Sequence, residues 1–259
     1  TRQLRSAIIA RGMYYEMLPN ADPAQVADAV FFWKATGQYE PPILERLVAL
    51  TYLGLGREEL WISRIFTGLF WVIGGLALYD LARRMALSGR EDSPGMAGAI
   101  ALVPLAYYLV LPFAIQASRS FQPDPGMVMW IILSVYALYR WSETRSWKWA
   151  LAAGILGGVA VLVKAVAAYI VGGAAVALAL YTLGIRRVWR SPQVWAMAGL
   201  MLAPSVLYYL IGSGGRAGRY FENWTLSLSH LLLSPTTYAR WFNLVQSLMG
   251  ITPLLLGLI

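Results

Sequence analysis

Long apolar stretches separated by short basic loops are the feature that most constrains the fold of this 259-residue chain. A helix needs about 20 apolar residues to cross the hydrocarbon core of a bilayer. Stretches of this kind follow one another from residue 62 to the chain end, and they are continuous rather than alternating. Because backbone groups in lipid must be hydrogen-bonded within the segment, continuous runs favour helices over barrel strands. The sequence therefore predicts an all-α protein that forms a polytopic transmembrane helical bundle.

Seven stretches are predicted to span the membrane, and two of them are short. They are Ile62–Leu81, Gly95–Phe113, Met127–Tyr139, Trp149–Val163, Ala165–Leu183, Val194–Ile211 and a last one from Leu244 that the chain end cuts at Ile259. Composition agrees, because 58% of the residues are hydrophobic and 13% are charged, whereas soluble domains have about 25% charged residues. Residues 62–259 are thus expected to form the transmembrane domain.

Basic residues set the expected orientation. Alternate loops carry them, namely Arg83, Arg84 and Arg90, then Arg140, Arg145 and Lys148, then Arg186, Arg187 and Arg190. By the positive-inside rule these loops face the cytoplasm. Residues 1–61, 114–125 and 212–243 and the turn at Lys164 then face outward. An outward N-terminal segment needs a way across the membrane, so we expect a further transmembrane helix before residue 1, in agreement with the absence of Met there.

The first 61 residues predict a long outer loop that contains short helices. Leu4–Met17, Asp22–Trp33 and Ile43–Leu55 carry apolar residues at helical spacing. The third is too short to span and too charged, at Glu45 and Arg46. We expect these amphipathic helices to lie in the membrane interface.

Asp124 is an unusual acidic residue, because it stands between two prolines at the mouth of an apolar helix. Ionisable groups at membrane depth favour a functional role. A structural alternative is that Asp124 is the N-cap of a helix that begins at Pro125. Capping does not exclude function, so both interpretations stay open.

Lys164 interrupts an apolar stretch from Trp149 to Leu183. A cation there is costly unless it reaches water or an anion. It can reach the outer interface by snorkelling, or it can bind a phosphate group. The net charge of +8, with more Lys and Arg residues assigned outside than inside, favours an anionic lipid or a phosphorylated substrate.

Several chemistries lack the residues they need. The chain has no Cys, which excludes disulfides and cysteine nucleophiles, and its one His has no partner for a typical zinc site. It has no P-loop, no glycine-rich dinucleotide motif and no nucleophile elbow. No soluble basic domain is visible, so we expect no nucleic-acid partner.

The order of several motifs resembles the GT-C glycosyltransferases, in the branch of the protein O-mannosyltransferases and lipid A aminoarabinose transferases. The first two are Arg2-Gln-Leu-Arg-Ser-Ala-Ile-Ile-Ala-Arg-Gly-Met-Tyr-Tyr15 and Tyr39-Glu-Pro-Pro-Ile-Leu-Glu-Arg-Leu-Val-Ala-Leu50. Ile62-Ser-Arg-Ile and Leu78-Tyr-Asp-Leu-Ala-Arg-Arg84 follow, then Phe121-Gln-Pro-Asp-Pro125 and Leu162-Val-Lys164. The resemblance covers roughly residues 2 to 165, and the remainder matches only in hydropathy.

The resemblance implies an inverting hexosyl- or pentosyltransferase with a polyprenyl-phosphate sugar donor and a lipid, glycan or protein acceptor. It further implies a bacterial plasma-membrane protein surrounded by membrane lipids, with its active site facing the periplasm or exterior. By matching position, Lys164 with Arg11 or Arg119 would bind the donor phosphate. Asp124 and Glu40 would be the catalytic carboxylates, and Asp124 would also bind a divalent metal ion if the enzyme uses one. Gln3, Tyr15 and Glu45 would line the substrate path.

One position departs from the family pattern. Relatives carry an acidic residue, the general base, early in the first outer loop, where this chain reads Thr-Arg-Gln-Leu-Arg-Ser. The base then lies before residue 1, or Glu16 or Glu40 replaces it, or the chain is a non-catalytic relative. A transporter or flippase of an anionic lipid or solute is a further alternative. Sugar, acceptor and oligomeric state stay open.

Overall fold

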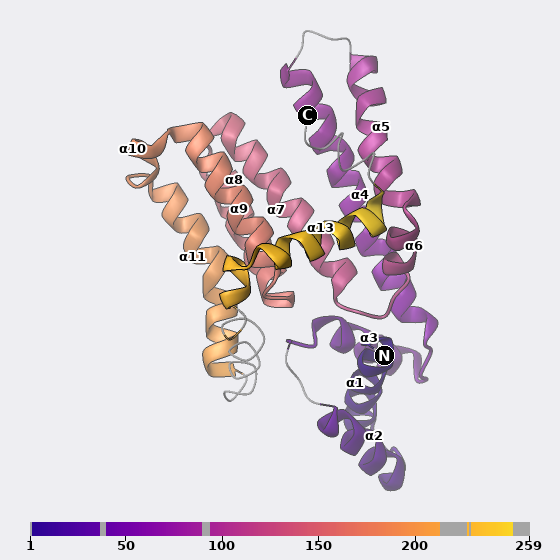
Figure 1. The fold of residues 1–259 in the computed structure, drawn as a ribbon. Coiled ribbons are helices and arrows are strands. Elements are labelled where there is room, and N and C mark those ends of the chain that lie inside the picture. Colours follow the sequence, from indigo (N-terminus) through magenta and orange to yellow (C-terminus); the bar gives the residue numbers. More distant parts are fainter. Residues whose placement is uncertain (1, 37–39, 90–93, 213–226, 228, 251–259) are drawn as a thin grey trace.

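The computed structural model describes residues 2–36, 40–89, 94–212, 227 and 229–250. All regular elements in this part of the chain are helices, which confirms the predicted all-α class. The elements are α1 Arg2–Met17, α2 Pro23–Ala35, α3 Ile43–Leu55, α4 Trp61–Gly89, α5 Pro94–Val110, α6 Pro112–Ser118, α7 Asp124–Thr144, α8 Trp147–Val163, α9 Ala167–Leu183, α10 Ile185–Val188, α11 Pro192–Leu207, the π-helix η1 Tyr208–Gly212, the 3-10 helix η3 Ser229–Leu233 and α13 Pro235–Met249 (Figure 1).

The three helices predicted for the N-terminal region are present, and their bounds agree with the sequence to within two residues. The carboxylate of Asp22 accepts a hydrogen bond from the Ala24 backbone N–H at 3.2 Å and caps α2. α3 ends at Gly56, whose φ of 68° lies in the left-handed region that glycine adopts without steric cost. Local capping and turn chemistry therefore fix where these helices begin and end.

A hydrophobic cluster joins these helices to the base of α4. Ile9 and Tyr14 of α1 pack with Val48 and Tyr52 of α3, and the cluster also includes Ile62 of α4. The rings of Tyr14 and Tyr52 meet edge to face with centroids 5.8 Å apart. In Figure 1 α1 and α3 lie at one end of the helical bundle, near the start of α7 and the end of α8.

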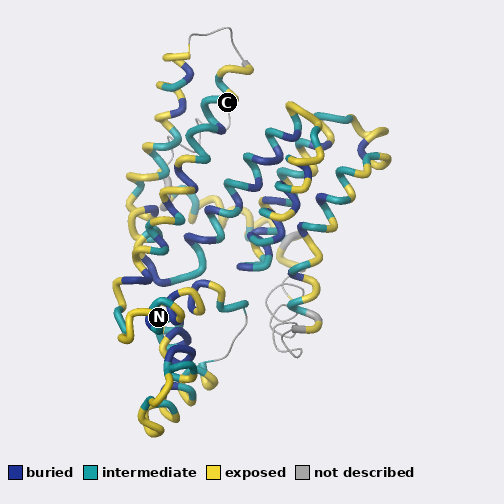
Figure 2. The backbone as a smooth tube through the Cα atoms, turned by 180° about the vertical axis from the view of Figure 1, so that it is seen from behind, coloured by how far each residue is buried: buried dark blue, intermediate teal, exposed yellow. Residues whose placement is uncertain are grey.

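The second hydrophobic core lies among α7, α8, α9 and α11. Its centre contains the fully buried Leu138 and Trp141 of α7. α8 approaches α11 closely because it carries Gly154 and Gly158 on the facing side; a Cβ on Gly158 would overlap the carbonyl oxygen of Leu200. Figure 2 shows that burial concentrates where these helices meet, whereas their outer sides are exposed.

In the described part of the chain, fewer helices than the seven predicted spans are long and apolar enough to cross a membrane. Among the described residues, α4 alone is long and apolar enough to cross a bilayer; α5 and α6, bent by 66°, count as a second span if taken together. α8, α9 and α11 have 16 or 17 residues, which at 1.5 Å per residue is about 25 Å, less than the roughly 30 Å of a hydrocarbon core. The predicted count of seven is therefore not confirmed.

The last predicted span is wrong in its bounds. α13 begins at Pro235, well before Leu244, and ends at Met249, because Gly250 adopts a φ of 82°. In Figure 1 α13 runs across the bundle rather than along it. The rest of that predicted span, residues 251–259, lies outside the described residues, as do Arg90 and residues 213–226 and 228 of the predicted outer loop 212–243.

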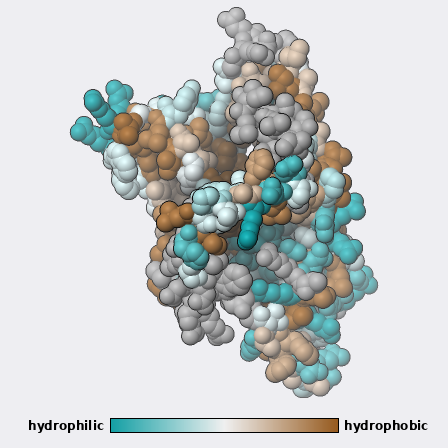
Figure 3. Space-filling view, viewed as in Figure 1, coloured by the Kyte–Doolittle hydropathy of each residue, from teal (hydrophilic) through white to brown (hydrophobic). Residues whose placement is uncertain are grey.

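Two of the three basic segments that the sequence predicts on one side lie at the same end of the bundle. The α7–α8 turn and α10, which carry Arg145, Arg186 and Arg187, lie at the end of the bundle opposite to α1 and α3 (Figure 1). The guanidinium of Arg145 donates to the backbone carbonyl of Thr182, which ties this turn to the end of α9. Figure 3 shows hydrophilic side chains at the tip formed by α10 and hydrophobic side chains on the bundle below it.

Candidate functional site

Asp124 is the first residue of α7. Pro123 occupies the N-cap position and Pro125 the first turn, and no side chain caps this helix end. The N-cap interpretation of Asp124 is therefore wrong, because the residue already belongs to the first turn of the helix. Its negative charge in the first turn still interacts favourably with the helix dipole.

Lys164 lies in the predicted tight turn between α8 and α9. Its backbone is extended, with φ −158° and ψ 119°, and its N–H donates to the carbonyl of Ala160, which ends α8. Its own carbonyl accepts from the N–H of Ala167, where α9 begins. The side chain is 17% exposed, so it is held within the protein rather than extended into solvent.

Asp124 and Lys164 form a hydrogen-bonded ion pair. Lys164 Nζ donates to Asp124 Oδ1 at 2.8 Å, across 40 residues of sequence. The second carboxylate oxygen, Oδ2, is buried and has no hydrogen-bond partner among the described residues. Buried polar atoms are almost always hydrogen-bonded, so Oδ2 can accept a hydrogen bond from a water molecule or from a ligand hydroxyl.

The pair borders a polar cavity of about 80 Å³. The cavity lies between the bundle and the N-terminal helices, and it is lined by Arg5, Ser6, Ile9, Glu40, Pro41, Pro42, Glu45, Gln122, Pro123, Asp124 and Lys164. Two cations and three carboxylates therefore face one small space. The lining residues come from α1, from the segment around Pro41 and Pro42, and from the start of α7 and the end of α8.

Glu45 is the most deeply buried charged group of this lining, at 5% exposure. The hydroxyl of Ser6 donates to Glu45 Oε1 at 2.6 Å and joins α1 to α3. Burial raises the pKa of the Glu45 carboxyl; the hydrogen bond from Ser6 opposes that rise, Glu40 adds to it, and Arg5 opposes it. Glu45 is therefore more readily protonated than a carboxyl group in water.

The predicted site residues separate into two groups. Asp124, Lys164, Glu40 and Glu45 meet at the polar cavity. Arg11 lies elsewhere: its Nε is 3.6 Å from Glu58 Oε2, and its guanidinium lies 5.5 Å from the ring centroid of Tyr15, also a predicted site residue.

The last two predicted residues, Arg119 and Gln3, are exposed and do not line the polar cavity. Their predicted roles, like those of the residues at the cavity, stay predictions. No group of three or more His, Asp and Glu residues in the described part of the chain is arranged to hold a metal ion.

Arg5 lines the cavity, although the sequence did not single it out. Helical spacing places Arg5 on the same face of α1 as Ile9, four residues later, but only the burial of Ile9 in the structure shows that this face is turned inward. Ser6 belongs to the same face and is likewise buried.

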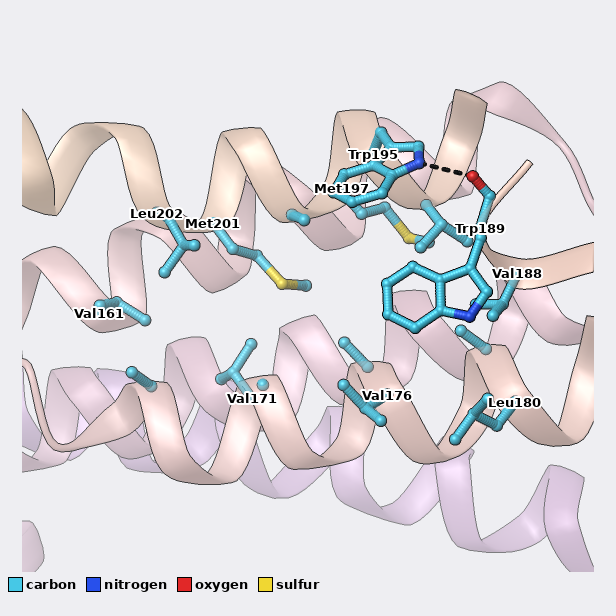
Figure 4. Close-up of a pocket in the computed structure, with 16 residues that line it drawn as sticks. Val161, Val171, Val176, Leu180, Val188, Trp189, Trp195, Met197, Met201 and Leu202 are labelled. Atoms are coloured by element: carbon cyan, nitrogen blue, oxygen red, sulfur yellow. Dashed lines mark hydrogen bonds between the residues drawn. The ribbon is translucent and has the colours of Figure 1, made fainter. Parts of the chain in front are cut away.

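A second cavity, of about 340 Å³, is apolar and lies among α8, α9 and α11. Figure 4 shows Val171, Val176 and Leu180 of α9 facing Met197 and Met201 across it. Trp189 and Trp195 close one end, where Trp195 Nε1 donates to the Trp189 carbonyl at 2.9 Å. The opposite end includes Val161 and Ala168, which flank Lys164 in the sequence.

Comparison with known families matches residues 40–209 to the family described as dolichyl-phosphate-mannose-protein mannosyltransferase. No curated protein and no solved structure gives a significant match. This family is one of the GT-C glycosyltransferases, the class that the resemblance predicted. Since the match covers more than half of the chain, the chain belongs to the dolichyl-phosphate-mannose-protein mannosyltransferase family. Members of this family are integral membrane proteins that use polyprenyl-phosphate-linked sugar donors and protein acceptors.

Proposed function

We propose that this protein transfers a sugar from a polyprenyl-phosphate donor to an acceptor hydroxyl on the non-cytoplasmic side of the membrane. The observation that carries the proposal is the Asp124–Lys164 ion pair, with Nζ and Oδ1 2.8 Å apart, at the edge of a polar cavity. An ammonium group pairs readily with phosphate oxygens. The donor phosphate would bind at Lys164, and the sugar would lie toward the cavity.

The reaction breaks the bond between the anomeric carbon and the phosphate oxygen and forms a bond from that carbon to the acceptor oxygen. Negative charge grows on the phosphate as the sugar leaves, and Lys164 stabilises this charge in the transition state. Attack from the opposite face inverts the anomeric carbon. The acceptor hydroxyl loses its proton to a carboxylate, for which Asp124 Oδ2 and Glu40 are the candidates that face the cavity.

The apolar cavity among α8, α9 and α11 supports a lipid-linked donor. One end of this cavity lies at Val161, one helical turn before Lys164, and its lining is formed by Val, Ala, Leu, Met and Trp side chains. A prenyl chain in this cavity would leave its phosphate near the Lys164 ammonium. This arrangement requires a polytopic protein whose shorter helices are embedded together with α4.

The position of the basic loops supports the proposed sidedness. Arg145, Arg186 and Arg187 lie at the end of the bundle opposite to Asp124 and Lys164. If the positive-inside rule orients the chain, the site faces away from the cytoplasm.

The proposal is tested with the full chain in proteoliposomes that contain polyprenyl-phosphoryl mannose and a Ser/Thr-containing peptide acceptor. We expect Lys164→Met and Asp124→Asn each to reduce transfer by about 100-fold or more, the scale of losing one transition-state contact. Lys148→Met is the matched control, because Lys148 is an exposed residue at the opposite end of the same helix. Transfer that is unaffected by Lys164→Met would overturn the proposed role of this residue.

The transport alternative has a distinct readout in the same vesicles. A flippase would move the labelled donor across the bilayer without forming a glycosylated product. Donor flux without product, abolished by Lys164→Met, would replace the proposed transferase activity by transport.

A further inference from the structure

Glu45 has no role in the proposed reaction, yet its carboxyl group lines the same cavity as Asp124 and Lys164. It is 5% exposed, and the hydroxyl of Ser6, which is 4% exposed, fixes its Oε1 at 2.6 Å. A buried carboxylate is retained at a cost unless it is paired or protonated. The question is which protonation state the bound donor would require.

The net charge of the cavity lining bears on the protonation state of Glu45. Its ionisable groups come from four places: Arg5 on α1, Glu40 and Glu45 around the start of α3, Asp124 on α7 and Lys164 after α8. Fully ionised, the lining has two positive and three negative charges, so its net charge is −1. Other cations near this end of the bundle, Arg11 of α1, Arg46 of α3 and Arg64 of α4, are exposed and do not line the cavity. A donor phosphodiester brings one more negative charge into a space that is already negative.

We infer that Glu45 binds the donor as a neutral carboxylic acid and donates its proton in a hydrogen bond to a phosphate oxygen. The inference rests on the proposed function. Protonation of Glu45 brings the lining to a net charge of zero, so Arg5 and Lys164 can both act on the phosphate. Ser6 then acts as a positioning residue, because its hydroxyl holds Oε1 and leaves the other oxygen for the ligand.

Glu45 is the carboxyl group best suited to hold this proton. Asp124 is paired with Lys164, and Glu40 is only half-buried, whereas burial raises the pKa of Glu45. A carboxyl group kept neutral by an apolar or desolvated site can serve as a hydrogen-bond donor at neutral pH. The ligand itself cannot supply the proton, because a phosphodiester is ionised at neutral and mildly acidic pH.

The test measures the affinity of the full chain, in detergent micelles, for a short-chain polyprenyl-phosphoryl mannose between about pH 5 and pH 8. For the wild type we expect the affinity to fall about tenfold per pH unit once Glu45 ionises, since only the protonated fraction binds. Glu45→Gln keeps the shape and a permanent N–H donor, so its affinity should be high and independent of pH. Glu45→Leu removes the donor and should bind weakly at every pH.

Ser6→Ala supplies a second, independent measurement. The hydrogen bond from Ser6 lowers the pKa of Glu45, so its removal should move the midpoint of the affinity profile to higher pH. A merely structural role of Ser6 would lower affinity equally at all pH values.

The outcomes separate the inference from the proposed function. Wild-type binding that is independent of pH, or a slope that persists in Glu45→Gln, overturns the inference while the proposed function stands. Loss of binding in Lys164→Met, together with the expected fall of wild-type affinity as pH rises, supports both the inference and the proposed function. If the wild type binds the mannosyl lipid at no pH, the proposed function and the inference both fail.

Discussion

Lys164 and Asp124 are each held by one helix end, and their charges meet where neither is fully shielded from water. The two side chains are 17% and 31% exposed. Ion pairs of such partial exposure contribute about 1 kcal/mol or less to stability, because water screens them. The pair therefore does not account for the fold, and a ligand phosphate can compete with Asp124 for the ammonium group.

A double-mutant cycle on this pair gives the first prediction. We expect Lys164→Met, Asp124→Asn and the double variant to show a coupling free energy of about 1 kcal/mol or less in chemical unfolding in micelles. The more exposed Asp80–Arg84 pair within α4, also 2.8 Å apart, serves as a comparison. A coupling several times larger at Asp124–Lys164 would mean that the pair is a structural contact that a ligand cannot displace.

The second prediction concerns Glu45 and the pH dependence of stability. Because burial raises the pKa of this carboxyl, the folded protein binds the proton more tightly than the unfolded chain does. The stabilisation is then complete below the unfolded pKa of about 4.3 and is lost as pH rises through the raised pKa of the folded state. Glu45→Gln should remove this loss and be more stable than the wild type at neutral pH.

The matched control for this experiment is Glu16→Gln, which changes an exposed carboxylate on α1. Its free energy of unfolding should follow the wild-type pH profile. If the Glu45→Gln profile also coincides with the wild type, Glu45 ionises as an ordinary surface carboxylate and the predicted linkage is absent.

Sequence reasoning identified part of the site at this scale. Asp124 and Lys164 were recognisable because a charge inside an apolar stretch is costly and calls for an explanation. Arg11 and Arg5 were not distinguishable by residue type, since both are arginines of one helix; only the packing of α1 against α3 shows which faces the cavity. The orphan oxygen of Asp124 depends on atomic positions that no sequence pattern contains.

At the scale of helices, close packing of α8 against α11 depends on residues without side chains. We predict that Gly158→Ala destabilises the protein by about 1 to 3 kcal/mol, because a Cβ there overlaps the Leu200 carbonyl and the backbone must move. Thermal unfolding in micelles measures this loss. Gly172→Ala is the control, because no atom lies within 4 Å of the Cβ it would add. Equal melting temperatures for the two variants would show that the helices separate without cost.

Helix positions were predictable and helix ends were less so. The bounds of α3 were predicted to the residue, since the Pro41-Pro42 pair and Gly56 mark its limits. The start of α7 was misjudged by one residue, because Pro123 and Pro125 are both compatible with a first helical turn. Hydropathy failed for α13, where Arg240 concealed the true start, and the left-handed backbone at Gly250 ends the helix inside an apolar run.

For the whole molecule, the sequence predicts that the polar cavity faces the non-cytoplasmic side of the membrane. This orientation is tested by labelling in cells. The chain has no natural Cys, so single cysteines can be introduced on a clean background. We expect a membrane-impermeant thiol reagent to label Gln122→Cys, beside the cavity, in intact cells. Lys148→Cys, at the opposite end of the bundle, should be labelled only after permeabilisation. Labelling of both positions in intact cells, or of Lys148→Cys alone, would contradict the proposed orientation.

The hairpin of α7 and α8 has one more consequence. Asp124 is the first residue of α7, and Lys164 follows the last residue of α8. The lengths of these two helices therefore determine whether the two charges meet. One residue added to either helix would turn its terminal side chain by about 100° around the helix axis. An insertion in α8 would turn the Lys164 ammonium away from Asp124, and an insertion in α7 would turn the Asp124 carboxylate away from Lys164. Either change would separate the two charges even if the apolar character of both helices were kept.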